Sequence, residues 1–171
     1  MRKALWLAAL FIASGLLTCT IYLIKYDVPD HYYLWLQLQT GLPFALACSL
    51  LWVRPARWIP AAVLIDCVIW VAALYIGVYL TFKVYSGVNT LLAGLLGGVG
   101  LTLATSLGCR SLLNRRTLLG AAFLGAVAGI PFGFSQGRSS RETMIFLVSF
   151  PIWQLAIGMW LHSRYSDIKN L

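Results

Sequence analysis

The sequence predicts an all-α integral membrane protein, folded as a six-transmembrane-helix bundle with both termini in the cytoplasm. Three observations predict this class. Hydrophobic residues make up 60% of the 171-residue chain and charged residues only 11%, whereas about a quarter of the residues in a typical soluble domain are charged. The mean hydropathy is +0.82. Six apolar stretches occupy most of the chain, and the segments between them are too short to form a soluble domain.

The expected spans are about 18 to 23 residues long, which at about 1.5 Å per residue covers a hydrocarbon core of about 30 Å. They are residues 4–24, 33–53, 60–82, 88–108, 117–134 and 143–162, within a single domain of residues 1–171. Helices are expected because lipid cannot satisfy open backbone hydrogen-bonding groups, and because the chain lacks the alternating polarity of a β-barrel.

Local signals mark the spans in order along the chain. The first stretch resembles a signal peptide, but it is about twenty residues long and has no small-residue cleavage site, so it should remain as a helix. Asp30 can cap the second span, and Pro60 suits the first turn of the third. Ser139-x-x-Glu142 has the spacing of a capping box that opens the sixth span. Prolines inside three spans should bend their helices; they are Pro43, Pro131 and Pro151.

The distribution of positive charge predicts the orientation, because Lys and Arg are retained on the cytoplasmic side during insertion. With the N-terminus inside, nine of the 13 Lys and Arg residues fall in cytoplasmic segments and four in external ones. Trp and Tyr residues near the span ends fit the same boundaries. The sequence therefore predicts an integral protein of the bacterial inner (plasma) membrane.

The net charge of +8 comes from residues scattered over loop ends rather than gathered on one polar face. Nucleic acid is therefore not expected as a partner, whereas the lipid bilayer and its anionic headgroups are. The four cysteines lie singly in or beside apolar runs and are interpreted as packing residues. No cofactor and no metal site are expected.

Small residues recur at a four-residue spacing in two consecutive spans. The fourth span carries Gly94 and Gly98. The fifth span carries Ala121, Gly125, Gly129 and Gly133. Positions four apart form a groove on one helix face, which lets another helix approach closely. Two alternatives follow: the two helices pack against each other, or a groove receives a membrane-protein partner or a second copy of the chain.

Asp66 is the only acidic residue well inside an expected span. A carboxylate there costs about 2.5 to 3.5 kcal/mol on insertion scales, so it should face the bundle interior. At about 1.5 Å per residue, Thr102, Gln154 and Ser14 reach a similar depth. These residues form a candidate polar site in which the carboxylate binds a proton or cation or hydrogen-bonds a substrate. The alternative is that Asp66 is structural and pairs with one of these side chains.

Arg138 and Arg141 lie in an expected outer loop, against the general distribution of positive charge. Near the start of the sixth span they could contact an anion. The alternative is that they reach lipid headgroups.

An enzyme is not expected, because His31 and His162 fall on opposite sides of the membrane and Asp66 has no acidic partner in another span. Transport or binding of a small solute, possibly as a subunit of a larger assembly, fits a six-helix bundle with an internal polar site. The six-span size and Ala9-x-x-x-Ala13 resemble the substrate-binding subunits of energy-coupling-factor vitamin transporters, which implies docking of the first helix to a coupling protein. The alternative is a non-catalytic scaffold or immunity-type protein that docks a partner through its glycine-rich helix faces.

Overall fold

The structure, a computed structural model, describes residues 2–24, 33–76, 87–133 and 140–169. Within these ranges the chain is helical and contains no β-strand, which confirms the all-α class. The α-helices are α1 (Arg2–Ile24), α2 (Tyr33–Trp52), α3 (Ile59–Leu74), α5 (Gly87–Ser106), α6 (Arg115–Gly133) and α7 (Ser140–Lys169). Two short 3-10 turns, η2 (Ala56–Trp58) and η4 (Arg110–Leu112), lie between helices.

Each described helix overlaps one of the six apolar stretches. The α-helix α3 ends at Leu74, residues 75–76 continue as a π-helical turn, and the rest of the expected span, to residue 82, lies outside the described ranges. The helix α7 continues past the expected end at residue 162 as far as Lys169. Residues 163–169 contain neither Gly nor Pro, so nothing in this polar segment interrupts the helix.

Side-chain and proline signals set where two helices begin. Pro60 occupies the first turn of α3, where its missing N–H is not needed. The Oδ1 of Asn114 accepts hydrogen bonds from the Thr117 N–H at 2.8 Å and the Thr117 hydroxyl at 3.0 Å, which caps α6. Pro43, Pro131 and Pro151 lie inside α2, α6 and α7. Two expected caps lie outside the described residues, namely Asp30 and Ser139.

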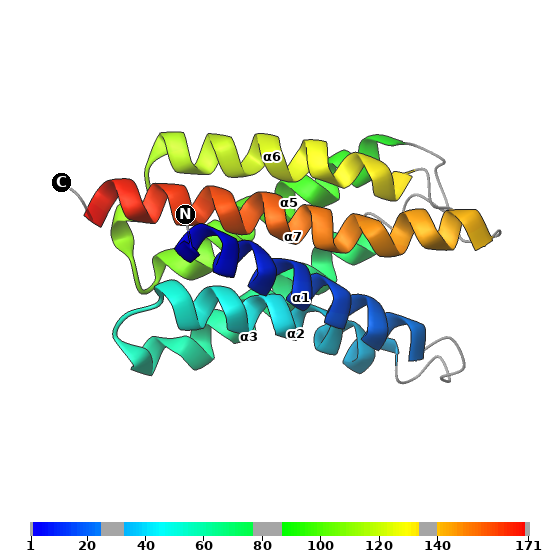
Figure 1. The fold of residues 1–171 in the computed structure, drawn as a ribbon, viewed down its shortest axis with the longest axis horizontal. Coiled ribbons are helices and arrows are strands. Elements are labelled where there is room, and N and C mark those ends of the chain that lie inside the picture. Colours follow the sequence, from blue (N-terminus) through cyan, green and yellow to red (C-terminus); the bar gives the residue numbers. More distant parts are fainter. Residues whose placement is uncertain (1, 25–32, 77–86, 134–139, 170–171) are drawn as a thin grey trace.

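The contacts among the α-helices of the described ranges close into a ring, and Figure 1 shows this bundle from the side. Around the ring the order is α1, α2, α3, α5, α6 and α7, and α7 packs back against α1. The helix α2 also contacts α5 and α7 across the centre. The first turn of α1 and the last turn of α7 lie toward the same end of the bundle, at the left of Figure 1.

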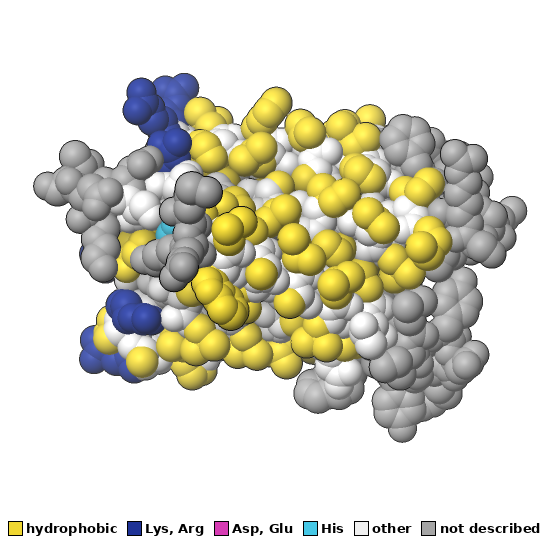
Figure 2. Space-filling model, in the orientation of Figure 1, with side chains coloured by type: hydrophobic (Ala, Val, Ile, Leu, Met, Phe, Trp, Pro, Cys, Tyr) yellow, Lys and Arg dark blue, Asp and Glu magenta, His cyan; other side chains and the backbone are white. Residues whose placement is uncertain are grey.

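Apolar side chains cover the outside of the ring, and many polar side chains lie within it. Hydrophobic side chains extend over most of the visible face in Figure 2. Trp6 and Phe123 are 77% and 68% exposed, whereas Gln154 and Thr102 are fully buried. Monomeric soluble proteins rarely expose so many large apolar side chains over one surface. Among the described residues, three helical segments are long and apolar enough to cross a membrane, namely Ala4–Ile21, Ala56–Leu74 and Val88–Ser106.

Aromatic side chains fill the centre of the helix bundle. The ring of Trp153 on α7 lies 5.6 Å from Phe44 on α2 and 5.8 Å from Trp70 on α3, between centroids. Phe11 on α1 lies 5.8 Å from both Phe44 and Trp52. These edge-to-face and tilted ring pairs are favourable aromatic arrangements, and they connect four of the six helices.

Helices α5 and α6 meet at backbone contact through their small residues. A side chain at Gly94 would collide with the carbonyl oxygen of Gly125, and one at Gly98 would collide with that of Ala121. A Cβ at Gly129 would lie only 2.6 Å from a backbone carbonyl oxygen of α5. The glycine-bearing faces of the two helices are therefore occupied by each other within the chain.

Candidate functional site

Asp66 lies near the middle of α3, enclosed by neighbouring helices. The residue is 5% exposed, and neither carboxylate oxygen has a hydrogen-bond partner. Among the side chains that the structure describes, it is the only carboxylate. A charged carboxylate that is buried without hydrogen bonds carries a large free-energy penalty, which a bound proton or cation would relieve.

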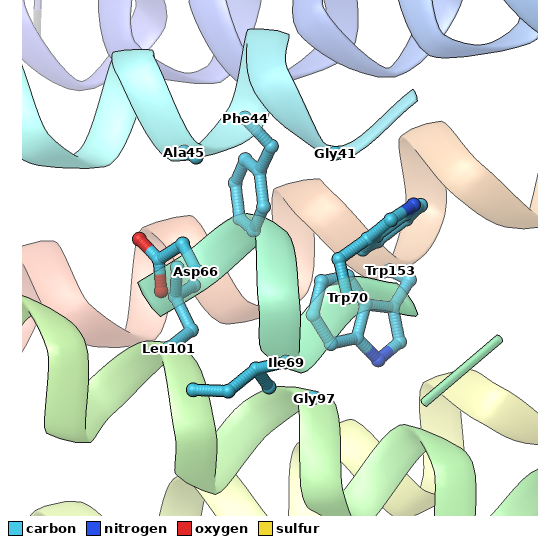
Figure 3. A pocket seen from close by; sticks show the side chains of 9 residues that line it. All are labelled: Gly41, Phe44, Ala45, Asp66, Ile69, Trp70, Gly97, Leu101 and Trp153. Atoms are coloured by element: carbon cyan, nitrogen blue, oxygen red, sulfur yellow. The ribbon is translucent and has the colours of Figure 1, made fainter. Parts of the chain in front are cut away.

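A cavity of about 10 Å³ adjoins Asp66 and is lined by residues of α2, α3, α5 and α7 (Figure 3). Two of its lining residues are glycines, and these leave room for the indole rings of the wall. A Cβ at Gly41 would lie 2.8 Å from the Trp70 ring, and a Cβ at Gly97 would lie 2.8 Å from the Trp153 ring. A space of this size holds about one water molecule.

The rest of the cavity wall is apolar and aromatic. Figure 3 shows Asp66 on one side of the Phe44 ring and the indoles of Trp70 and Trp153 on the other. Asp66 is the only charged residue of those that line the cavity. A small cation in this space would therefore meet one carboxylate and aromatic rings, whose faces attract positive charge.

A series of hydrogen bonds connects side chains of four helices, and its last member lines the cavity. The hydroxyl of Ser14 donates to Oε1 of Gln154 at 2.6 Å, and Nε2 of Gln154 donates to the Thr18 hydroxyl at 3.1 Å. The Thr18 hydroxyl donates to the Thr40 carbonyl oxygen at 2.9 Å. The indole N–H of Trp70 donates to the Thr40 hydroxyl at 2.9 Å. Because Trp70 also lines the cavity, these hydrogen bonds hold its indole ring in place in the wall beside Asp66.

The structure brings together only part of the candidate polar site. Ser14 and Gln154 are in direct contact. The oxygens of Asp66 bond to neither of them. The hydroxyl of Thr102 donates to the Gly98 carbonyl oxygen of its own helix at 2.8 Å. Of the four residues, therefore, only Ser14 and Gln154 are hydrogen-bonded to each other.

Three residues of this hydrogen-bonded series, Thr18, Thr40 and Trp70, were not predicted from the sequence to belong to the polar site. Thr18 had a detectable signal, because it follows Ser14 by four residues and shares its face of α1. Nothing in the sequence indicates that the Thr40 hydroxyl and the Trp70 indole bond to each other, since this contact depends on how α2 and α3 are rotated.

Several candidate contacts lie beyond what the structure describes. Arg138 is outside the described residues. Arg141 is within α7, and Gly133 ends α6, but their surroundings are outside the described part. In the described part of the chain, no group of three or more His, Cys, Asp and Glu residues is placed to hold a metal ion.

Comparison with known proteins gives no match: no family model, no curated protein and no solved structure matches the chain. The chemistry of its own residues therefore carries the functional conclusion. That chemistry consists of one unpartnered carboxylate beside a water-sized cavity, and a chain of hydroxyl, amide and indole groups next to it.

Replacing Gln154 by Leu is expected to lower the free energy of unfolding by about 1 kcal/mol, because hydrogen bonds between membrane helices average about 0.6 and reach about 1.7 kcal/mol. The loss is moderate because the Ser14 hydroxyl also lies 2.9 Å from the Phe11 carbonyl oxygen, and Thr18 keeps its bond to Thr40. Unfolding in mixed detergent micelles measures the change. Gln39→Leu is the matched control, because Gln39 is exposed; an equal loss in both variants would contradict the expectation.

Proposed function

We propose that this chain is a six-span membrane protein that transports or binds a small solute and uses Asp66 to bind a proton or a small cation. The observation that carries the proposal is the buried Asp66 carboxylate, which has no hydrogen-bond partner and adjoins a small cavity between helices. Ionisable residues inside membrane bundles are costly and mark ion and proton pathways.

Helix length and charge support the proposed topology. The helices have 16 to 30 residues, and helices of this size are about 24 to 45 Å long, compared with a hydrocarbon core of about 30 Å. The end where α1 begins and α7 ends also carries arginine side chains (Figures 1 and 2). Positive charge favours the cytoplasmic side. We assign this end to the cytoplasm of a bacterial cell, with the bundle in its inner membrane.

The size of the cavity favours a proton or a bare cation as the species that meets Asp66. A volume of about 10 Å³ accepts about one water molecule, so an organic solute does not fit beside Asp66 in this arrangement of the helices. Such a solute would enter only if the surrounding helices moved apart. Binding of a proton or cation would change the charge at the point where α2, α3, α5 and α7 meet, and so couple the ion to that movement.

Proton uptake by liposomes tests the proposal. Purified protein is reconstituted in liposomes that contain a pH-sensitive dye, and a potassium diffusion potential drives inward current. Asp66→Asn is expected to lower proton uptake at least about tenfold, because an amide lacks the carboxylate's proton-binding site. Asp66→Glu restores the carboxylate and is expected to keep part of the rate. Asp167→Asn, near the end of α7, removes a carboxylate elsewhere and serves as the matched control.

Infrared difference spectra provide a second readout that needs no solute. Titration with acid or with sodium is expected to change a carboxyl C=O band in the wild type and not in Asp66→Asn. Identical spectra and identical fluxes of protons and sodium in both proteins, with both shown to be folded, would contradict the proposal.

A further inference from the structure

Positive charge gathers at one end of the bundle, and no described acidic side chain balances it there. Figure 2 shows these basic side chains at the left, above and below the centre. The exposed arginines come from the α2–α3 and α5–α6 turns and are Arg54, Arg57, Arg110, Arg115 and Arg116. Asp66, the one described carboxylate, is buried within the ring.

The α5–α6 turn is fixed against α7. Leu112 in this turn is fully buried. The indole N–H of Trp160 on α7 donates to the Thr117 carbonyl oxygen in the first turn of α6 at 3.1 Å, and a Cβ at Gly120 would collide with the same indole. The guanidinium carbon of Arg164 lies 4.3 Å from the centroid of the Trp160 ring. We call the surface formed by Arg110, Arg115, Arg116, Trp160 and Arg164 the basic corner.

We propose that the basic corner binds the headgroup of an anionic phospholipid that carries two phosphate groups. Guanidinium groups bind phosphate oxygens through paired hydrogen bonds. Basic pockets between membrane helices on the cytoplasmic side suit diphosphate headgroups. Arg110, Arg115 and Arg116 supply three exposed positive charges within a few residues of one another along the chain, which complements the two negative charges of such a headgroup.

An apolar strip on α6 extends away from the basic corner and suits the acyl chains. Leu119, Phe123, Val127 and Ile130 are 58%, 68%, 45% and 40% exposed. Their spacing of three and four residues places them along one face of the helix that begins at Arg115. The positively charged basic corner can bind the headgroup, and the adjoining apolar strip can contact the acyl chains. This combination favours a lipid over free phosphate, which would contact the guanidinium groups alone.

The α2–α3 turn offers a matched control of equal charge at the same end. The Nη1 of Arg54 already donates to the carbonyl oxygens of Leu50 at 3.2 Å and Val53 at 2.8 Å. Arg57 lies beside its neighbour Trp58, at 6.0 Å from the ring centroid. Removing these two charges changes the net charge as much as removing Arg115 and Arg116, but leaves the basic corner intact.

Native mass spectrometry of the full chain in detergent tests the site, with diphosphatidylglycerol, phosphatidylcholine and inorganic phosphate as probes. The wild type is expected to retain diphosphatidylglycerol about tenfold or more over phosphatidylcholine. The double variant Arg115→Gln/Arg116→Gln should lose affinity by about 10- to 30-fold, because each juxtamembrane arginine adds to the attraction of an anionic lipid. The control Arg54→Gln/Arg57→Gln should lose less than about twofold, since only diffuse attraction is removed.

Three results would overturn the inference: equal losses in the two double variants, equal retention of the two lipids, or full displacement of the lipid by millimolar inorganic phosphate. The exposed positions of Arg115 and Arg116 make loss of folding unexpected, and an unchanged melting temperature verifies this. The inference depends on the membrane location in the proposed function and not on Asp66, so the lipid assay and the liposome assay can fail independently.

Discussion

Replacing Gly94 by Leu is expected to prevent α5 and α6 from packing and to abolish most of the folded protein. Even a Cβ at this position would collide with the Gly125 carbonyl oxygen, which belongs to a backbone and cannot rotate away. Overpacking typically costs about 1 to 3 kcal/mol and sometimes more, and a branched side chain against a backbone belongs at or above the upper end of that range. Total stabilities are only about 5 to 15 kcal/mol.

The yield of monodisperse protein in size-exclusion chromatography and the detergent unfolding midpoint measure this effect. Val127→Leu is the control, because Val127 on α6 is 45% exposed and an added carbon there meets surrounding lipid or detergent. A Gly94→Leu protein with wild-type stability that has only lost a partner subunit would show that the groove serves assembly, and would contradict the packing described here.

Replacing Trp153 by Ala is expected to destabilise the protein by about 3 to 5 kcal/mol, the usual range for removing a buried tryptophan. Trp153 is 5% exposed, and its ring packs against Phe44 and Trp70. The variant also removes part of the wall beside Asp66. Water should therefore enter the enlarged space, and a surviving folded fraction should leak protons.

Trp6→Ala is the matched control for Trp153→Ala, because the same atoms are removed from a residue that is 77% exposed. Thermal unfolding in detergent should place Trp6→Ala within about 0.5 kcal/mol of the wild type, as is usual for surface substitutions. If the two variants melted at the same temperature, the central aromatic cluster would not determine stability.

The helices were predictable because each contains a long apolar segment that raises the local hydropathy, and every α-helix in the described ranges overlaps an apolar stretch. The continuation of α7 beyond the sixth span was not predictable in this way. The segment after His162 is polar, so hydropathy places it outside a span, yet the backbone continues as a helix to Lys169. Helix length depends on the absence of breaking residues and not on polarity.

The burial of Asp66 was predictable from the cost of exposing a carboxylate to lipid, but its neighbours were not. Counting residues gives the height of a side chain along a helix, whereas its direction depends on how the helix is rotated in the bundle. Gln154 bonds to α1, while Asp66 adjoins a cavity among α2, α3, α5 and α7. Similar height therefore did not imply a hydrogen bond.

Two kinds of contact hold this bundle together, namely hydrogen bonds between side chains and close packing of glycine backbones. Asp66 lies between the helices held by the first kind and those held by the second. Directional bonds fasten α1, α2, α3 and α7 to one another, which resists sliding because each bond needs a fixed alignment. The α5–α6 hairpin is held by close fit between glycine backbones, and fit depends on separation more than on alignment. A hydrogen bond from Trp160 to the Thr117 carbonyl oxygen joins this hairpin to α7, while Asp66, Gly97 and Leu101 line the cavity where α3 meets α5. A rocking of the hairpin against the other four helices would therefore change the space beside Asp66.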